Sequence, residues 1–251
     1  MIADAPGAVL AAFVVFSRIG TCLMLMPGFS SPRIPVQARL FIALALSLAL
    51  TPMLLPVLVP ILRDAAPATL FRLMASEAMI GAAIGMLGRV FFIALEAVAV
   101  AIAMSVGLSA NLGVPLGEEE ALPALSTLLV LGGTTLLFVT DQHLEIFRAL
   151  AASYTALPVP DGFPLQFALV RLTDAAVMTF KLALRIGSPF LVFSVLTNVA
   201  VGLINRLVPN VQVFFLSTPF LLIGGLYILY LMAPTMLDLF AAAFNRFLVL
   251  G

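Results

Sequence analysis

The chain has 251 residues, of which 63% are hydrophobic and 10% charged, and its twelve basic side chains balance twelve acidic ones. A soluble domain carries roughly 25% charged residues, and a water-soluble fold of this size could not hide so much apolar surface. The composition therefore predicts a membrane protein, or one covered by other membrane proteins. The balanced charge argues against nucleic acid as a partner. One cysteine, Cys22, and one histidine, His143, exclude an internal disulfide and most metal or acid–base chemistry.

Six apolar stretches approach the roughly 20 residues that a membrane-spanning helix needs. The first lacks a basic head and a following small-residue cleavage site, so we expect it to be retained rather than removed as a signal peptide. None shows the alternation of barrel strands, so all six are predicted to be helices of an all-α integral membrane protein. In chain order they are Val9–Met26, Leu40–Leu62, Leu70–Met104, Leu125–Val139, Ala168–Leu207 and Val211–Ala233.

The long apolar runs and the frequent prolines predict interrupted helices. Leu70–Met104 and Ala168–Leu207 each exceed one crossing, and the short fourth run contains Gly132-Gly133. A proline removes a backbone donor and bends or breaks a helix unless its neighbours compensate. We therefore expect several helices to be broken into hairpins, at prolines such as Pro52, Pro189, Pro219 and Pro234.

Between the fourth and fifth apolar stretches, His143–Leu157 is expected to form an amphipathic helix. Asp141 and Glu145 favour its positive N-terminal end, with Thr140 or Asp141 as the cap. The sequence has no repeat, linker or low-complexity tract, so residues 1–251 are predicted to form a single domain.

Ionisable residues recur on one face of the fifth stretch. Arg171, Asp174, Met178, Lys181 and Arg185 follow a spacing of 3, 4, 3 and 4, which aligns them along a helix. A charge at bilayer depth costs at least about 2.5–3.5 kcal/mol, so this face should not meet lipid. Two interpretations remain open: Asp174 pairs with Arg171 or Lys181 as structural support, or the face forms the wall of a water-filled conduit.

The third stretch also carries charges, at Glu77, Arg89 and Glu96. Arg89 and Glu96 share a helix face, whereas the partner of Glu77 is expected on another helix. Interhelical or intersubunit pairing is favoured over a proton relay, because no histidine accompanies them. The glycines of "GAAIGMLG", which are Gly81, Gly85 and Gly88, fall close to one side of the same helix and predict close helix packing.

A polar loop, "NLGVPLGEEEALPALS" (Asn111–Ser126), interrupts the middle of the chain. Its prolines stiffen the segment and its glycines let it turn. Three consecutive glutamates need water or cationic partners. From the residues alone, the segment is interpreted as an exposed loop whose acids stay solvated. Walker, dinucleotide-binding, nucleophile-elbow and metalloprotease motifs are missing, so the sequence gives little support for an enzyme or a bound cofactor.

Short motifs along nearly the whole chain, in this order and spacing, resemble the FliR family of type III export-gate proteins, which serve flagella and injectisomes. The matching motifs are Ser17-Arg18-Ile19-Gly20, Pro27-Gly28-Phe29, Ile34–Arg39, "EAMIGAAIG" (Glu77–Gly85), Gly107-Leu108-Ser109, "DQHLEIFRALAASYTALP" (Asp141–Pro158), Pro209–Phe214, Pro219 and Gly224-Gly225.

The resemblance implies a non-enzymatic subunit of the flagellar export gate in the bacterial inner membrane, within the flagellar basal body. Its implied partners are FliP-like and FliQ-like subunits, FlhB-like and FlhA-like proteins, unfolded export substrates and membrane lipid. Alternatives are an injectisome homologue and a small-solute secondary transporter, which also uses broken helices and midplane charges. No internal repeat favours the transporter.

The resemblance also implies roles for particular residues. The mid-chain loop is expected to lie inside the pore and help plug it, and a second set is expected to make intersubunit or buried polar contacts. The plug candidates are Gly107, Leu108, Asn111, Pro115, Gly117, Glu118, Glu119, Glu120 and Pro123. The polar-contact candidates are Arg18, Glu77, Arg89, Glu96, Asp174, Lys181, Arg185, Asn210 and Gln212.

Overall fold

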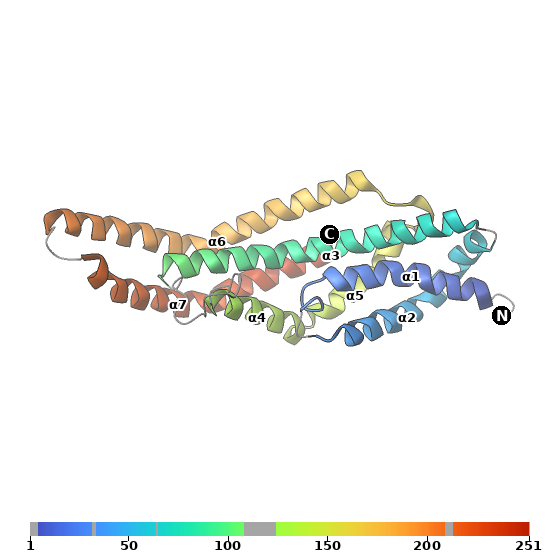
Figure 1. The fold of residues 1–251 in the computed structure, drawn as a ribbon, viewed down its shortest axis with the longest axis horizontal. Helices are drawn as coiled ribbons and strands as arrows, with labels where there is room; N and C mark the ends of the chain where they lie inside the picture. Colours follow the sequence, from blue (N-terminus) through green and yellow to red (C-terminus); the bar gives the residue numbers. More distant parts are fainter. Residues whose placement is uncertain (1–4, 32–33, 64, 108–123, 209–212, 251) are drawn as a thin grey trace, which may run out of the picture. The chain divides into compact units, whose positions relative to one another are not determined.

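A computed structural model describes residues 5–31, 34–63, 65–107, 124–208 and 213–250. Every regular element in these ranges is a helix, which confirms the predicted all-α fold. Figure 1 shows the elements, which in chain order are α1 (Ala5–Leu25), α2 (Val36–Leu62), α3 (Pro67–Ser105), α4 (Ala124–Val139), α5 (Gln142–Ala156), the short 3-10 helix η1 (Val159–Asp161), α6 (Leu165–Leu207) and α7 (Val213–Leu250).

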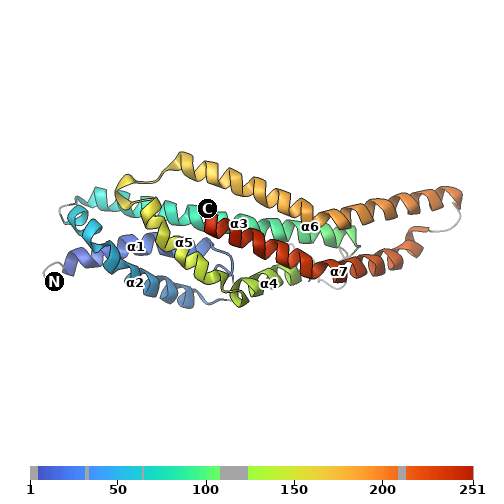
Figure 2. The ribbon, with the colours of Figure 1, turned by 180° about the vertical axis from the view of Figure 1, so that it is seen from behind.

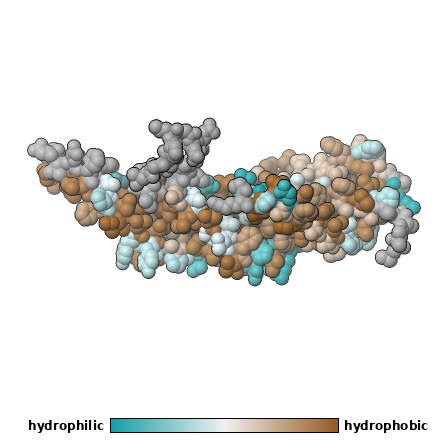
Figure 3. Space-filling view, turned by 60° about the horizontal axis from the view of Figure 1, so that its bottom comes forward, coloured by the Kyte–Doolittle hydropathy of each residue, from teal (hydrophilic) through white to brown (hydrophobic). Residues whose placement is uncertain are grey.

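Five of the described helices are long and apolar enough to cross a membrane: α1, α2, α3, α6 and α7. The pair α4 and α5, which is broken between the two helices, would make a sixth span. This number agrees with the six apolar stretches of the sequence. Apolar side chains cover much of the face shown in Figure 3, as expected for surface that contacts lipid or other membrane proteins.

The predicted breaks at prolines are wrong for the described helices. Helix α3 runs for 39 residues and α6 for 43, although α6 contains Pro189. Helix α7 continues through Pro234 to Leu250, well beyond the predicted end at Ala233. A proline removes one intrahelical hydrogen bond, but the flanking turns keep theirs, so an apolar helix can continue through it.

Helix α2 shows how several prolines fit into one helix. Pro52, Pro56 and Pro60 are spaced four residues apart and are all exposed. The carbonyl groups that they leave without a donor therefore fall along one outward side. On the buried side, the Thr51 hydroxyl donates to the Ser47 carbonyl at 2.6 Å and the Ser47 hydroxyl donates to the Ala43 carbonyl at 2.6 Å.

The break between α4 and α5 occurs at a residue that is neither proline nor glycine. Asp141 has φ 56°, a left-handed conformation that costs energy for most residues but is tolerated by aspartate. Asp141 occupies the predicted N-cap position of α5, but its side chain makes no capping hydrogen bond. The Thr140 hydroxyl instead donates to the Leu136 carbonyl at 2.7 Å. The predicted cap is therefore correct in position and wrong in its hydrogen bond.

The chain divides into two compact units. The first contains residues up to Val90 with Asp141–Ala176 and the last residues from Phe247, and the second contains Phe91–Thr140 and Val177–Arg246. Helices α3, α6 and α7 each contribute residues to both units. The single domain expected from the sequence remains a prediction.

The second unit has an aromatic core. Phe91 and Phe244 lie with ring centroids 5.6 Å apart, and Phe92 and Phe240 lie 5.1 Å apart, both in edge-to-face geometry. Such pairs add to the stabilisation from apolar burial. In the first unit, by contrast, a charged side chain lies at the centre of the packing.

Candidate functional site

Arg18 and Glu77 form an ion pair that is fully removed from solvent. The Arg18 Nε donates to Glu77 Oε2 at 2.7 Å and its Nη2 donates to Oε1 at 2.6 Å, and both side chains are 0% exposed. This two-bond geometry is the strongest form of an arginine–carboxylate contact. The pair joins α1 to α3 inside the first unit.

The other donors of Arg18 bind the C-terminal end of α5. Its Nη1 donates to the Ser153 carbonyl and hydroxyl oxygens, each at 3.1 Å, and its Nη2 donates to the Leu157 carbonyl at 2.9 Å. All five N–H groups of the guanidinium therefore have an acceptor. Figures 1 and 2 show α5 beside α1.

The end of α5 suits a cation for two reasons. The last carbonyl groups of a helix lack intrahelical donors, and the helix dipole places partial negative charge there. Tyr154 adds a cation–π contact, because the Arg18 Cζ lies 4.1 Å from the centre of its ring. The Tyr154 hydroxyl then donates to the Val15 carbonyl on α1 at 3.2 Å. The charge of Arg18 is thus surrounded by acceptors from α3 and α5.

The position of Arg18 follows from the buried stripe of α1. Val15, Ile19 and Cys22 are fully buried at helical spacing, and Arg18 lies within the same stripe. Glu77 similarly lies between the buried residues Leu73 and Ile80 of α3. Each charge would be very costly at such a position without its partner.

The three glycines of α3 bring it close to α1. A Cβ added at Gly81 would lie 2.0 Å from the Arg18 carbonyl oxygen, and one at Gly85 would lie 2.7 Å from the Cys22 carbonyl oxygen. At Gly88 it would lie 2.4 Å from the sulfur of Met26. Because glycine has no side-chain carbon, this face of α3 lets the backbones of α3 and α1 approach closely. Because Glu77 is one turn before Gly81, this close approach also places its carboxylate beside Arg18.

The remaining charged candidates are not brought together. Arg89 is exposed on α3, Glu96 is half-buried, and neither forms an ion pair with any residue that the structure describes. On α6, Asp174, Lys181 and Arg185 are exposed and also lack an ion pair there. The predicted pairing of Asp174 with Arg171 or Lys181 is therefore not present in the single chain.

Several sequence-predicted residues cannot be placed. Asn210 and Gln212 lie outside the described residues, as do all plug candidates after Gly107. Gly107 itself has φ 79° just after α3 ends, a conformation that glycine adopts without strain. The chain therefore turns where the predicted plug loop begins.

The acceptors on α5 were not predicted from the sequence. Ser153 and the Leu157 carbonyl were not candidates, because a backbone acceptor leaves no signature in the sequence. The exposed ion pair between Arg148 and Glu145, which are three residues apart on α5, was not predicted either. In the described ranges, no group of three or more His, Cys, Asp or Glu side chains could hold a metal ion.

These features define an all-helical, multi-pass membrane protein in which a buried ion pair joins three helices. The chain belongs to the family described as bacterial export proteins, family 1, whose sequence profile matches residues 9–247. That membership makes it a protein of an export system and not an enzyme.

The chain is similar to three proteins that are each named flagellar biosynthetic protein FliR. The chain is 33% identical to the protein from Caulobacter vibrioides over 89% of this chain and 88% of that one. It is 27% identical to the Escherichia coli protein over 69% and 68% of the two chains. For the Aquifex aeolicus protein the identity is 26% over 87% and 83%.

Replacing Glu77 by glutamine tests the ion pair. E77Q keeps the side-chain volume but leaves Arg18 charged and without its counter-ion, so we expect it to lower the free energy of unfolding by about 3–5 kcal/mol. Thermal unfolding of the full chain in detergent measures the loss. R148Q, which breaks the exposed pair on α5, should change stability by less than about 1 kcal/mol. Equal effects of the two variants would contradict the assignment.

Replacing Gly81 by alanine tests the close approach of α1 and α3. The new Cβ would overlap the Arg18 carbonyl, so G81A should destabilise the chain and lower its unfolding temperature. Gly202 on α6 is the matched control, since a Cβ there meets nothing within 4 Å. G202A should leave the unfolding temperature unchanged or raise it, because alanine is favoured over glycine in a helix by about 1 kcal/mol. A harmless G81A substitution would show that the helices are farther apart.

Proposed function

We propose that this chain is the FliR-type subunit of a flagellar type III protein export gate in the bacterial inner membrane, within the flagellar basal body. The observation that carries the proposal is its 33% identity, across 89% of its length, to a protein named flagellar biosynthetic protein FliR. In this role the chain forms part of the export pore with FliP-like and FliQ-like subunits, near FlhB-like and FlhA-like proteins. Its cargo is unfolded export substrate.

The surface of α6 supports assembly with other subunits. In the single chain, Asp174, Lys181 and Arg185 are exposed without an ion pair in the described ranges, although α6 is otherwise strongly apolar. The acyl chains of lipid cannot satisfy these charges, whereas a neighbouring subunit or a hydrated lumen can. The exposed apolar side chains of the same helix, such as Leu196 and Leu207, need lipid or protein around them.

The flagellar system is favoured over an injectisome because the relatives from Caulobacter vibrioides, Escherichia coli and Aquifex aeolicus are named as flagellar proteins. The secondary-transporter alternative gains no support from these relatives. Helix breaks were one reason to consider a transporter, but α3 and α6 are each continuous.

We further propose that the mid-chain loop after Gly107 helps to close the pore. The loop is bounded by the end of α3 and the start of α4, and its three glutamates require a hydrated or cationic environment. Glu118–Glu120 would then face the aqueous lumen, while Pro115 and Pro123 limit the conformations of the loop.

Co-purification tests the proposed assembly. A tagged chain expressed with the other gate genes should bring FliP-like and FliQ-like proteins with it through detergent extraction. K181Q should reduce their yield, because it removes an unpaired charge of α6, whereas R148Q on α5 serves as a matched control and should not. If the parent chain, expressed with the other gate genes, purified alone or as a homo-oligomer, this result would contradict the proposal.

Deleting residues 112–120 tests the plug. In cells that carry the complete gate, the deletion should raise the leak of small ions across the inner membrane, measured as loss of membrane potential. Co-purification of the partners with the deleted chain is the control for assembly. An unchanged leak through an assembled gate would exclude the plug role without affecting the export assignment.

A further inference from the structure

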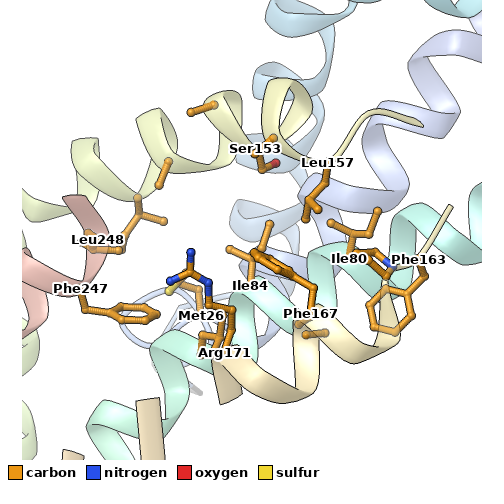
Figure 4. A pocket seen from close by; sticks show the side chains of 18 residues that line it. Met26, Ile80, Ile84, Ser153, Leu157, Phe163, Phe167, Arg171, Phe247 and Leu248 are labelled. Atoms are coloured by element: carbon orange, nitrogen blue, oxygen red, sulfur yellow. The ribbon is translucent and has the colours of Figure 1, made fainter. Parts of the chain in front are cut away.

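A mostly apolar cavity of about 250 Å³ lies within the first unit. Its walls come from α3, α5, the start of α6 and the residues at the end of α7 (Figure 4). Side chains of alanine, leucine, isoleucine, phenylalanine and methionine dominate the lining, including Ile84, Ile146 and Phe163. Such walls favour a hydrocarbon ligand.

Among the described residues that line the cavity, Arg171 alone carries a charged side chain. Its side chain is half-buried, its Cζ lies 5.1 Å from the centre of the Phe167 ring, and its guanidinium lies among the apolar side chains in Figure 4. Asp174 is one turn further along α6, but Arg171 forms no ion pair with it or with any other described residue. The cavity therefore combines apolar walls with a cation whose counter-ion the described chain does not supply.

We propose that this cavity binds an acyl chain of an anionic phospholipid, with the lipid phosphate accepting hydrogen bonds from Arg171. The volume is below the roughly 300–1,000 Å³ of sites that enclose a whole small molecule, and suits part of a linear chain. The protein lies in a membrane, where anionic phospholipids supply both an acyl chain and a phosphate. Basic pockets between membrane helices bind such headgroups by the same charge complementarity.

The cavity shares two residues with the buried ion pair. Ser153 and Leu157 line it, and both accept hydrogen bonds from Arg18. A bound acyl chain would therefore pack against the helix end that Arg18 holds in place. Because the lipid binds the folded chain, it should raise the unfolding temperature of the protein as well as occupy the site.

Lipid titration of the full chain in a neutral detergent tests the proposal. Native mass spectrometry counts bound phosphatidylglycerol, and thermal unfolding reports its effect, with phosphatidylcholine and inorganic phosphate as comparison ligands. We expect phosphatidylglycerol to bind and stabilise, and the two comparison ligands to do so far less. R171Q should weaken phosphatidylglycerol binding at least about fivefold, the contribution of one basic side chain near an anionic lipid.

Three variants separate the site from general effects. R171K keeps the charge and should bind phosphatidylglycerol more tightly than R171Q, which also shows that position 171 tolerates substitution. R206Q, at an exposed arginine in the last turn of α6, should bind like the parent chain. A149F should weaken binding, because Ala149 lines the cavity and the larger ring fills it.

Four results would overturn the proposal. In the binding assay, R171Q or A149F would bind phosphatidylglycerol as tightly as the parent chain, phosphatidylcholine would bind equally well, or inorganic phosphate would displace the lipid. In cells, a photo-crosslinker at position 149 would capture another polypeptide. The binding assay does not depend on export, so its failure would leave the proposed gate function untouched. Conversely, lipid binding would survive if the chain purified without partners.

Discussion

A guanidinium removed from water needs an acceptor for each of its five N–H groups, and in this chain those acceptors come from two other helices. Glu77 on α3 accepts two hydrogen bonds from Arg18, and the end of α5 accepts the remaining three. The three helices must therefore meet at one point and in one register. Apolar contacts alone would tolerate small shifts between them, whereas this set of directional bonds does not.

The glycines of α3 make the ion pair geometrically possible. Since the side chain of Glu77 is short relative to a helix diameter, it can reach a fully buried Arg18 only if α1 and α3 approach closely, and Gly81 permits that approach. The core of the second unit is apolar instead, with aromatic rings packed edge to face around Phe244. Lys181 and Arg185 of that unit lie on its exposed surface, where partners can satisfy their charges.

The sequence predicted the helices and much of the buried pair, but not its full geometry. Apolar length identified the spans, and Arg18 and Glu77 were both among the polar-contact candidates. The continuity of α6 through Pro189 could not be predicted, since it depends on whether the flanking turns keep their hydrogen bonds. The acceptor role of the Leu157 carbonyl could not be predicted either, because every residue carries the same backbone group.

A double-mutant cycle at Arg18 and Glu77 tests the central claim most directly. The free energy of unfolding would be measured for the full chain, for R18M, for E77M and for the chain that carries both substitutions. Each single change leaves one buried charge unpaired and should cost about 3–5 kcal/mol, whereas the double change removes both charges and should cost less than either. A double variant that loses the sum of the two single effects would show that the two side chains act independently, and the account would be wrong.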